Sequence, residues 1–280
     1  MCASPREITT MSKRNSQAAK TAARERLRQE RERQAKREKV RRQLIVAGSV
    51  VAVLAAAGGI GYAVVQANKP AYWETAKDDK LVKPANATGK DGTTVLVGKD
   101  TAKKTLVIYE DPRCPVCASF EQVVGPTVKK DLDAGKYKVQ FVGATFLDNG
   151  FGGEGSKNAL SALGAALNVG PEAFLEFKSA LYSKKWHPEE RDDKFKDDSY
   201  LIEIADTVPA LKGNAKFQKD VKDGTFDRWA LEESKVFDKD GIEGTPTLKM
   251  DGKALTDAGG KNAPMTVEEF NTALEAALKG

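Results

Sequence analysis

The sequence has little histidine and little cysteine. Its 280 residues include one His and three Cys. These residues cannot supply a set of four-ligand zinc sites, and three Cys are too few for a disulfide-stapled scaffold. The chain also has only 24 Gly and 11 Pro, and 40% of it is hydrophobic, so it is neither fibrous nor disordered throughout. The composition predicts a folded part, and the length allows one or two domains.

The charge is unevenly distributed along the chain. Residues 1–43 hold 14 of the 45 Lys+Arg and 5 of the 40 Asp+Glu, so they carry +9 and residues 44–280 carry −4. A segment from Leu44 to Val65 follows with no charged residue. As a helix it would be about 33 Å long, enough for a bilayer core of about 30 Å. The pattern predicts a single transmembrane helix at residues 44–65.

The basic excess precedes this apolar run, which predicts a cytoplasmic N-terminus and an extracytoplasmic remainder. The alternative is a signal peptide cleaved after Ala67, although the apolar run and its lead are long for one. Within residues 1–43, acids alternate with bases and no aromatic side chains interleave. We therefore expect a basic, salt-bridged cytoplasmic helix attracted to the lipid bilayer, and no nucleic-acid binding. Translation starts at Met1 or at Met11.

Residues 66–92 are rich in Lys, Asp, Ala and Pro without periodicity, which predicts an extracytoplasmic linker. Residues 93–280 are long enough for one buried core. Hydrophobic patterning places strands and helices alternately along this domain. Strands are expected at residues 93–97, 105–109, 138–146, 247–250 and 253–256. Helices are expected at residues 156–167, 172–182, 199–207, 215–221, 226–237 and 267–278. The layout is an α/β sheet with a helical insert at about residues 152–238.

A C-x-x-C motif stands where the strand 105–109 gives way to a helix. Its residues are Cys114, Pro115, Val116 and Cys117. Backbone N–H groups at a helix start and the positive charge of Arg113 favour a thiolate at the first sulfur. A thiol with an ordinary pKa of about 8.5 is about 3% ionised at pH 7, whereas one lowered to about 6 is about 90% ionised. The motif predicts Cys114 as the nucleophile and Cys117 as an inward-facing resolving thiol.

Other interpretations of the two cysteines are weaker. A zinc knuckle needs two further ligands, and only His187, expected at the surface, and Cys2, across the membrane, remain. We predict no metal site. A structural disulfide across two residues would constrain little chain. A second motif matches G-x-G-x-x-G at residues 150–155, but no strand ending in an acid follows about 20 residues later, which favours a mobile loop over a nucleotide site.

Near the end of the domain, Thr245-Pro246 stands directly before the strand 247–250. A proline lacks the N–H that a strand needs, so we expect a cis Thr245-Pro246 bond at the sheet edge. Together with the C-x-x-C motif and the helical insert, this resembles the DsbA-like branch of the thioredoxin superfamily over about residues 93–280. The resemblance implies a thioredoxin-like fold.

The resemblance also implies roles for individual residues. In that family the cis-proline loop lies against the first cysteine and holds the substrate, which here points to Thr245 and Pro246 beside Pro115 and Val116. Many relatives carry a buried acid six residues before the first cysteine. That position is Ile108 here, which leaves Glu110 or a water as the proton acceptor for the second thiol. The Pro-Val dipeptide lacks the His of some relatives and predicts a less oxidising couple.

The leading hypothesis is a membrane-tethered, extracytoplasmic thiol:disulfide oxidoreductase that needs no cofactor. We expect it to oxidise exported proteins with cysteine thiols, and the resemblance implies reoxidation by a membrane quinone-linked protein. A reductase or isomerase is the alternative enzyme. A substrate-binding or chaperone module without redox turnover is the alternative from another class.

Overall fold

The computed structural model describes residues 20–28, 31–34, 36–37 and 71–279. Contacts divide the chain into the units Met1–Pro70 and Ala71–Gly280. In the first unit the described residues are helical and exposed, as expected for the basic segment, and Arg28 pairs with Glu32 one turn later at 3.4 Å. The apolar run 44–65 lies outside the described residues. No helix within the described ranges is long and apolar enough to cross a bilayer.

The second unit is built on a five-stranded sheet with the order β1-β3-β2-β4-β5. Its strands are β1 (Val95–Val97), β2 (Thr105–Glu110), β3 (Lys138–Gly143), β4 (Thr247–Met250) and β5 (Lys253–Leu255). The central strand β2 runs parallel to β3 and antiparallel to β4. Ile108 pairs with Phe141 on one side and Leu248 on the other, and all three side chains are buried. The expected α/β fold is confirmed.

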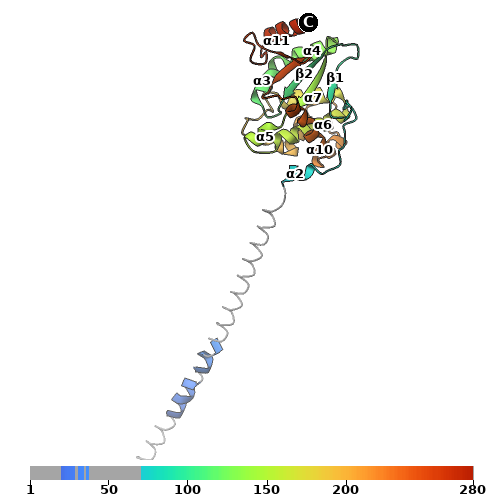
Figure 1. Cartoon of the computed structure of the whole chain (residues 1–280). Helices are drawn as coiled ribbons and strands as arrows, with labels where there is room; N and C mark the ends of the chain where they lie inside the picture. The colour runs from blue at the N-terminus through green and yellow to red at the C-terminus, as the bar shows by residue number, and fades with distance from the viewer. Residues whose placement is uncertain (1–19, 29–30, 35, 38–70, 280) are drawn as a thin grey trace, which may run out of the picture. The chain divides into compact units, whose positions relative to one another are not determined.

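Helices cover the sheet and form the insert. The first two are α3 (Pro115–Val123) and α4 (Gly125–Ala134), which lie between β2 and β3. The insert between β3 and β4 contains α5 (Phe146–Gly150), α6 (Gly155–Val169), α7 (Pro171–Leu181), η1 (Lys194–Lys196), α8 (Asp198–Ala205), α9 (Ala215–Lys222) and α10 (Asp227–Lys239). The long α6 contacts α7, α8, α9 and α10, so it is the insert's central helix. The C-terminal α11 (Val267–Lys279) lies at the opposite end of the unit from α10 (Figure 1).

One expectation about these elements was wrong, and one helix was missed. The strand expected to reach Phe146 ends at Gly143, because its partner β2 ends at Glu110, the residue that pairs with Gly143. Phe146 instead begins α5. Helix α4 was not anticipated. It begins at a Gly-Pro pair, where proline fits the first helical turn.

Residues 71–92 belong to the second unit and pack on the rest of it rather than forming an open linker. Helix α2 (Tyr72–Ala76) buries Trp73, which is 5% exposed, and lies beside α10 (Figure 1). The Tyr72 hydroxyl donates to Asp227 at 2.6 Å. Further along, the side chain of Asn86 donates to the Leu167 carbonyl at 2.8 Å. The compact unit therefore begins at Ala71, earlier than the expected residue 93.

Candidate active site

The C-x-x-C motif lies at the start of α3, directly after the sheet's central strand. Strand β2 ends at Glu110, a short loop follows, and Cys114 caps the helix while Pro115 occupies its first turn. Proline suits that turn because no partner is needed for the N–H that it lacks. The Cys114 sulfur accepts the backbone N–H of Cys117 at 3.4 Å. The sulfur therefore takes the place that a side-chain oxygen has in an ordinary N-cap.

The Cys114 sulfur has the electrostatics of a thiolate. Its pKa is lowered to about 6, chiefly by a hydrogen bond from the Cys117 thiol, with the Thr245 side chain and the backbone N–H groups of Cys117 and Val116 adding to the effect. Burial opposes this shift, since Cys114 is only 6% exposed. At pH 7 such a thiol is about 90% ionised. The expected helix-start N–H groups do contribute, whereas Arg113 is not among the main causes.

The second cysteine lies in the interior. Cys117 is fully buried against Ala118, Leu147 and Tyr182. Burial raises its pKa well above the usual value, and the hydrogen bond that it donates to Cys114 adds to the shift. Both cysteines are free thiols. The pair thus combines one ionised and one protonated sulfur, as a nucleophile and a resolving thiol require.

The Thr245-Pro246 bond is cis, as expected from the sequence. It precedes β4 and brings the Thr245 carbonyl oxygen to 3.6 Å from the Cys114 sulfur. The loop borders a groove of about 670 Å³ that also includes Val116, which is 48% exposed. Three acidic residues lie along the same groove, namely Glu243, Asp257 and Glu269. Pro115 is exposed at the helix start. The four residues expected to bind substrate are therefore grouped around one sulfur.

A buried charge cluster lies behind the cysteines. Glu110 is 6% exposed, and its pKa is raised to about 7 by burial, which outweighs the attraction of Lys178. The Lys178 ammonium group lies 3.2 Å from Glu110 and 2.6 Å from Glu121. One oxygen of Glu110, Oε2, has no hydrogen-bond partner. The negative charge of Glu110 also raises the pKa of Cys117. The charge interaction shows that Glu110 lies near Cys117, whereas Ile108 is part of the core.

Arg113 is buried among residues of the insert. Its side chain is 1% exposed, and its guanidinium lies 3.0 Å from the Asp148 carboxylate. His187 is likewise not a surface residue. It is half-buried, stacks on Tyr182 and contacts the Pro112 carbonyl oxygen through Nε2 at 3.1 Å. Burial lowers the pKa of His187.

Several site residues had no signal in the sequence. Lys178, Asp148 and Tyr182 come from the insert, at sequence distances that no spacing rule connects to Cys114. Glu121 is the exception, because it follows Cys114 by seven residues and residues seven apart share one face of a helix.

Comparisons with known proteins show which family the chain resembles. A family model described as Thioredoxin matches residues 90–276. Disulfide bond formation protein D of Bacillus subtilis (strain 168) is 27% identical over 186 residues, which cover 66% of this chain and 77% of that protein. Oxidised BdbD from Bacillus subtilis matches the fold with a TM-score of 0.55 at 24% identity, covering 71% of this chain and 100% of that one. Oxidised DsbA from Mycobacterium tuberculosis gives 0.52 at 24% identity, covering 64% and 99%.

The fold and the paired cysteines define a thioredoxin-type protein, and the chain belongs to the thioredoxin family. Within that family it is a DsbA-like thiol:disulfide oxidoreductase.

Proposed function

We propose that this chain is a membrane-tethered, extracytoplasmic oxidase that introduces disulfides into exported proteins through Cys114 and Cys117. The observation that carries the proposal is the state of the Cys114 sulfur. It has a pKa of about 6 and lies beside a buried partner thiol. Stabilising the Cys114 thiolate stabilises the reduced form of the cysteine pair, which makes the disulfide form a stronger oxidant.

The oxidase reaction starts from the Cys114–Cys117 disulfide. A substrate thiolate attacks Cys114, a mixed disulfide forms, and Cys117 leaves as a thiolate. Glu110, whose pKa is about 7, holds a proton that it can donate to this leaving group. A second substrate thiolate then attacks the substrate sulfur of the mixed disulfide, and Cys114 leaves as a stabilised thiolate. The substrate loses two electrons and the cysteine pair gains them.

The substrate segment is held beside the cis-proline loop. Thr245 and Pro246 offer a backbone edge next to the nucleophile, and Pro115 and Val116 form the exposed opposite border. An extended peptide can pair with such an edge through its backbone. Its cysteine would then reach Cys114 whatever the neighbouring side chains are. This arrangement suits a broad range of exported substrates.

The tether and the reoxidation partner rest on the sequence and on the family. The uncharged run 44–65 and the basic residues before it support a single-pass anchor with a cytoplasmic N-terminus. The catalytic unit then faces the oxidising side of the membrane. A membrane quinone-linked protein would accept the two electrons from the reduced pair. The full chain should stay with membranes after extraction at alkaline pH, whereas a variant lacking residues 44–65 should not. A full chain released by this treatment would refute the anchor.

Oxidative refolding of a reduced, disulfide-containing substrate tests the enzyme itself. Cys114→Ser should abolish the activity, while Cys2→Ser, which changes the cysteine outside the pair, should leave it intact. Undiminished activity of Cys114→Ser would leave only a binding or chaperone role at the groove. The reduction potential of the cysteine pair shows whether the enzyme oxidises or reduces its substrates. A value of about −120 to −180 mV supports oxidation of substrates, whereas about −270 mV supports a reductase.

A further inference from the structure

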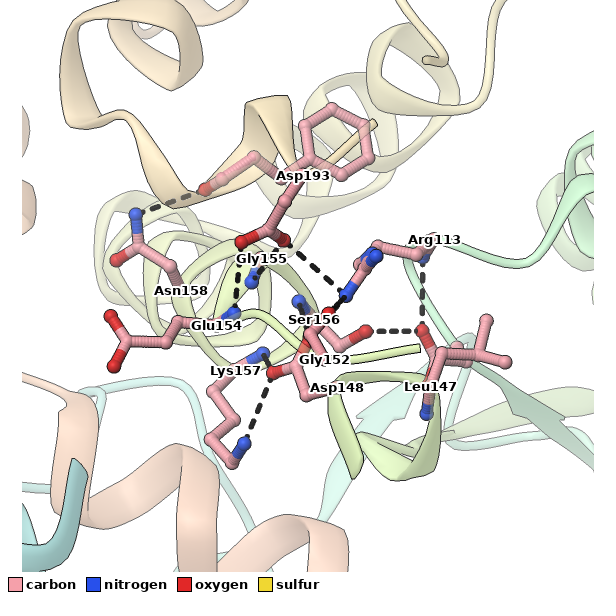
Figure 2. Close-up of polar contacts among 12 residues, drawn as sticks. Arg113, Leu147, Asp148, Gly152, Glu154, Gly155, Ser156, Lys157, Asn158 and Asp193 are labelled. Carbon is pink, nitrogen blue, oxygen red and sulfur yellow. Dashed lines mark hydrogen bonds and ion pairs between the residues drawn. The ribbon is translucent and has the colours of Figure 1, made fainter. Parts of the chain in front are cut away.

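Arg113, the residue before the nucleophile, is held by the helical insert. Its guanidinium donates to Asp148 at 3.0 Å, to the Gly152 carbonyl at 2.9 Å and to the Glu190 carbonyl at 2.9 Å. It also forms an ion pair with Asp193 at 3.3 Å. Figure 2 shows the side chain of Arg113 pointing towards the carboxylates of Asp148 and Asp193. A planar guanidinium has donors that point in several directions and can reach all of these acceptors. The ammonium group of a lysine cannot make the same set of hydrogen bonds.

The two carboxylates also cap the insert's central helix (Figure 2). Asp193 accepts the backbone N–H groups of Glu154 and Gly155 at 3.0 and 2.9 Å. Asp148 accepts those of Ser156 and Lys157 at 2.9 and 3.0 Å. The start of α6 is therefore occupied by carboxylates of the chain itself. This accounts for the glycine motif at 150–155 without a nucleotide, and the end of that motif is fixed rather than a free loop.

The rest of the loop 111–114 is fastened to the same insert. The Asp111 carboxylate accepts the Ser156 hydroxyl at 2.6 Å and the Leu147 backbone N–H at 3.2 Å. It also accepts the backbone N–H of Arg113 at 2.9 Å, which fixes the turn from within. With the His187 contact to Pro112, each residue between β2 and Cys114 has a partner in the insert or in the loop itself.

Neighbouring carboxylates neutralise the positive charge of Arg113. Arg113 and Lys157 face Asp148 and Asp193, so two positive charges meet two negative ones. The field that reaches Cys114 from this cluster is the small difference between opposed charges. Arg113 therefore lacks the electrostatic influence expected for a cation next to the nucleophile in sequence.

We propose that Arg113 is a positioning residue for thiol-disulfide exchange, which fastens the loop 111–114 to the insert and thereby holds the Cys114 sulfur at the Cys117 N–H and at Thr245. The proposal rests on the proposed function of the cysteine pair. The sulfur depends on this placement because its contact with the Cys117 N–H, at 3.4 Å, is long and easily lost. A loop that relaxes by a fraction of an ångström weakens this donor, which stabilises the thiolate.

Substitutions distinguish positioning from a direct charge effect. If the charge of Arg113 acted on Cys114, Arg113→Met would raise the pKa of Cys114, Asp148→Asn would lower it, and Arg113→Lys would leave it unchanged. If Arg113 positions the loop, all three raise it, because each breaks the same set of contacts. The expected rise is about one unit, the effect of losing one hydrogen bond to a charged group.

The experiment is a pH titration of the thiolate absorbance in the reduced full chain, with circular dichroism as a check of folding. The titratable groups facing Cys114 are Glu110 on β2, Cys117 on α3 and Tyr182 after α7, and no variant changes them. Arg191→Met is the matched control, because Arg191 is exposed and lies over the Phe151 ring. It should leave the pKa unchanged.

A lower pKa in Asp148→Asn, or an unchanged pKa in Arg113→Lys, would overturn the proposal. Should Arg113→Met fail to fold, Arg113→Lys and Asp193→Asn carry the test, since the first keeps the buried charge and the second changes a partly exposed partner. The titration uses no substrate. Its result is therefore independent of the refolding assay. A failure of the oxidase function would appear in the refolding assay and not in the titration.

Discussion

The reduction potential of the cysteine pair should depend on pH with a change of slope near pH 6. Below that pH both sulfurs of the reduced form are protonated, so two protons accompany two electrons. Above it the Cys114 sulfur is a thiolate, while Cys117 keeps its proton because its pKa is raised well above the usual value. One proton then accompanies two electrons. The potential should fall by about 59 mV per pH unit below pH 6 and by about 30 mV per unit above it.

The same ionisation sets how oxidising the pair is at neutral pH. A pKa lowered to about 6 in the folded, reduced form stabilises that form at pH 7 by about 1.4 kcal/mol relative to an unperturbed thiol. For a two-electron couple this corresponds to about 30 mV. The sign follows from the direction of the shift: the stabilisation is present above pH 6 and is lost as the pH falls through 6. The pair should be about 30 mV more oxidising than one with an unperturbed first thiol.

The measurement is redox equilibration with glutathione from about pH 5 to pH 8, followed by acid quenching, alkylation and mass spectrometry. Glu110 provides the control, because its pKa of about 7 adds its own pH dependence. Glu110→Gln should remove any feature near pH 7 and leave the break near pH 6. A slope of about 59 mV per pH unit that continues to pH 8 would refute the lowered pKa of Cys114.

Two further predictions concern stability. Lys178→Met leaves the buried Glu110 and the partly buried Glu121 without their cation and should lower the free energy of unfolding in urea by about 3 kcal/mol. Lys129→Met, which removes largely exposed pairs with Asp133 and Glu172, should change it by less than about 0.5 kcal/mol, and equal effects would contradict the buried cluster. Gly164→Ala would place a Cβ 2.7 Å from the Trp229 ring and should cost about 2 kcal/mol in thermal unfolding. Gly150→Ala meets nothing within 4 Å, so a Gly164→Ala variant as stable as Gly150→Ala would refute the packing.

Local signals in the sequence were sufficient for the parts of the site that depend on neighbours in the chain. The cysteine spacing placed Cys114 at a helix start and Cys117 inside it, and the proline before a strand indicated a cis Thr245-Pro246 bond. These features follow from backbone geometry within a few residues. The strands of the sheet were found for the same reason, because hydrophobic runs identify buried strands wherever their partners lie.

The contacts between the helical insert and the rest of the unit could not be predicted from such local signals. Lys178 occupies a helix with a mixed sequence, where a lysine normally indicates a solvated face, yet it is 3% exposed in its side chain. Its burial follows from the placement of α7 over the end of β2, which is a property of the tertiary fold. The partners of Arg113 were missed for a related reason. Proximity in sequence suggested an effect on Cys114, whereas the partners of the guanidinium lie about 35 to 80 residues away.

The position of the buried acid shows how the insert and the redox centre depend on each other. Glu110 lies two residues after Ile108 on the same face of β2, and both side chains are buried. At the end of β2 this carboxylate is buried and needs a counter-ion, which Lys178 supplies from the insert. Arg113 is fastened to the insert as well. Because the insert provides both the cation behind Cys117 and the anchor beside Cys114, a change in its packing should alter the two sulfurs together.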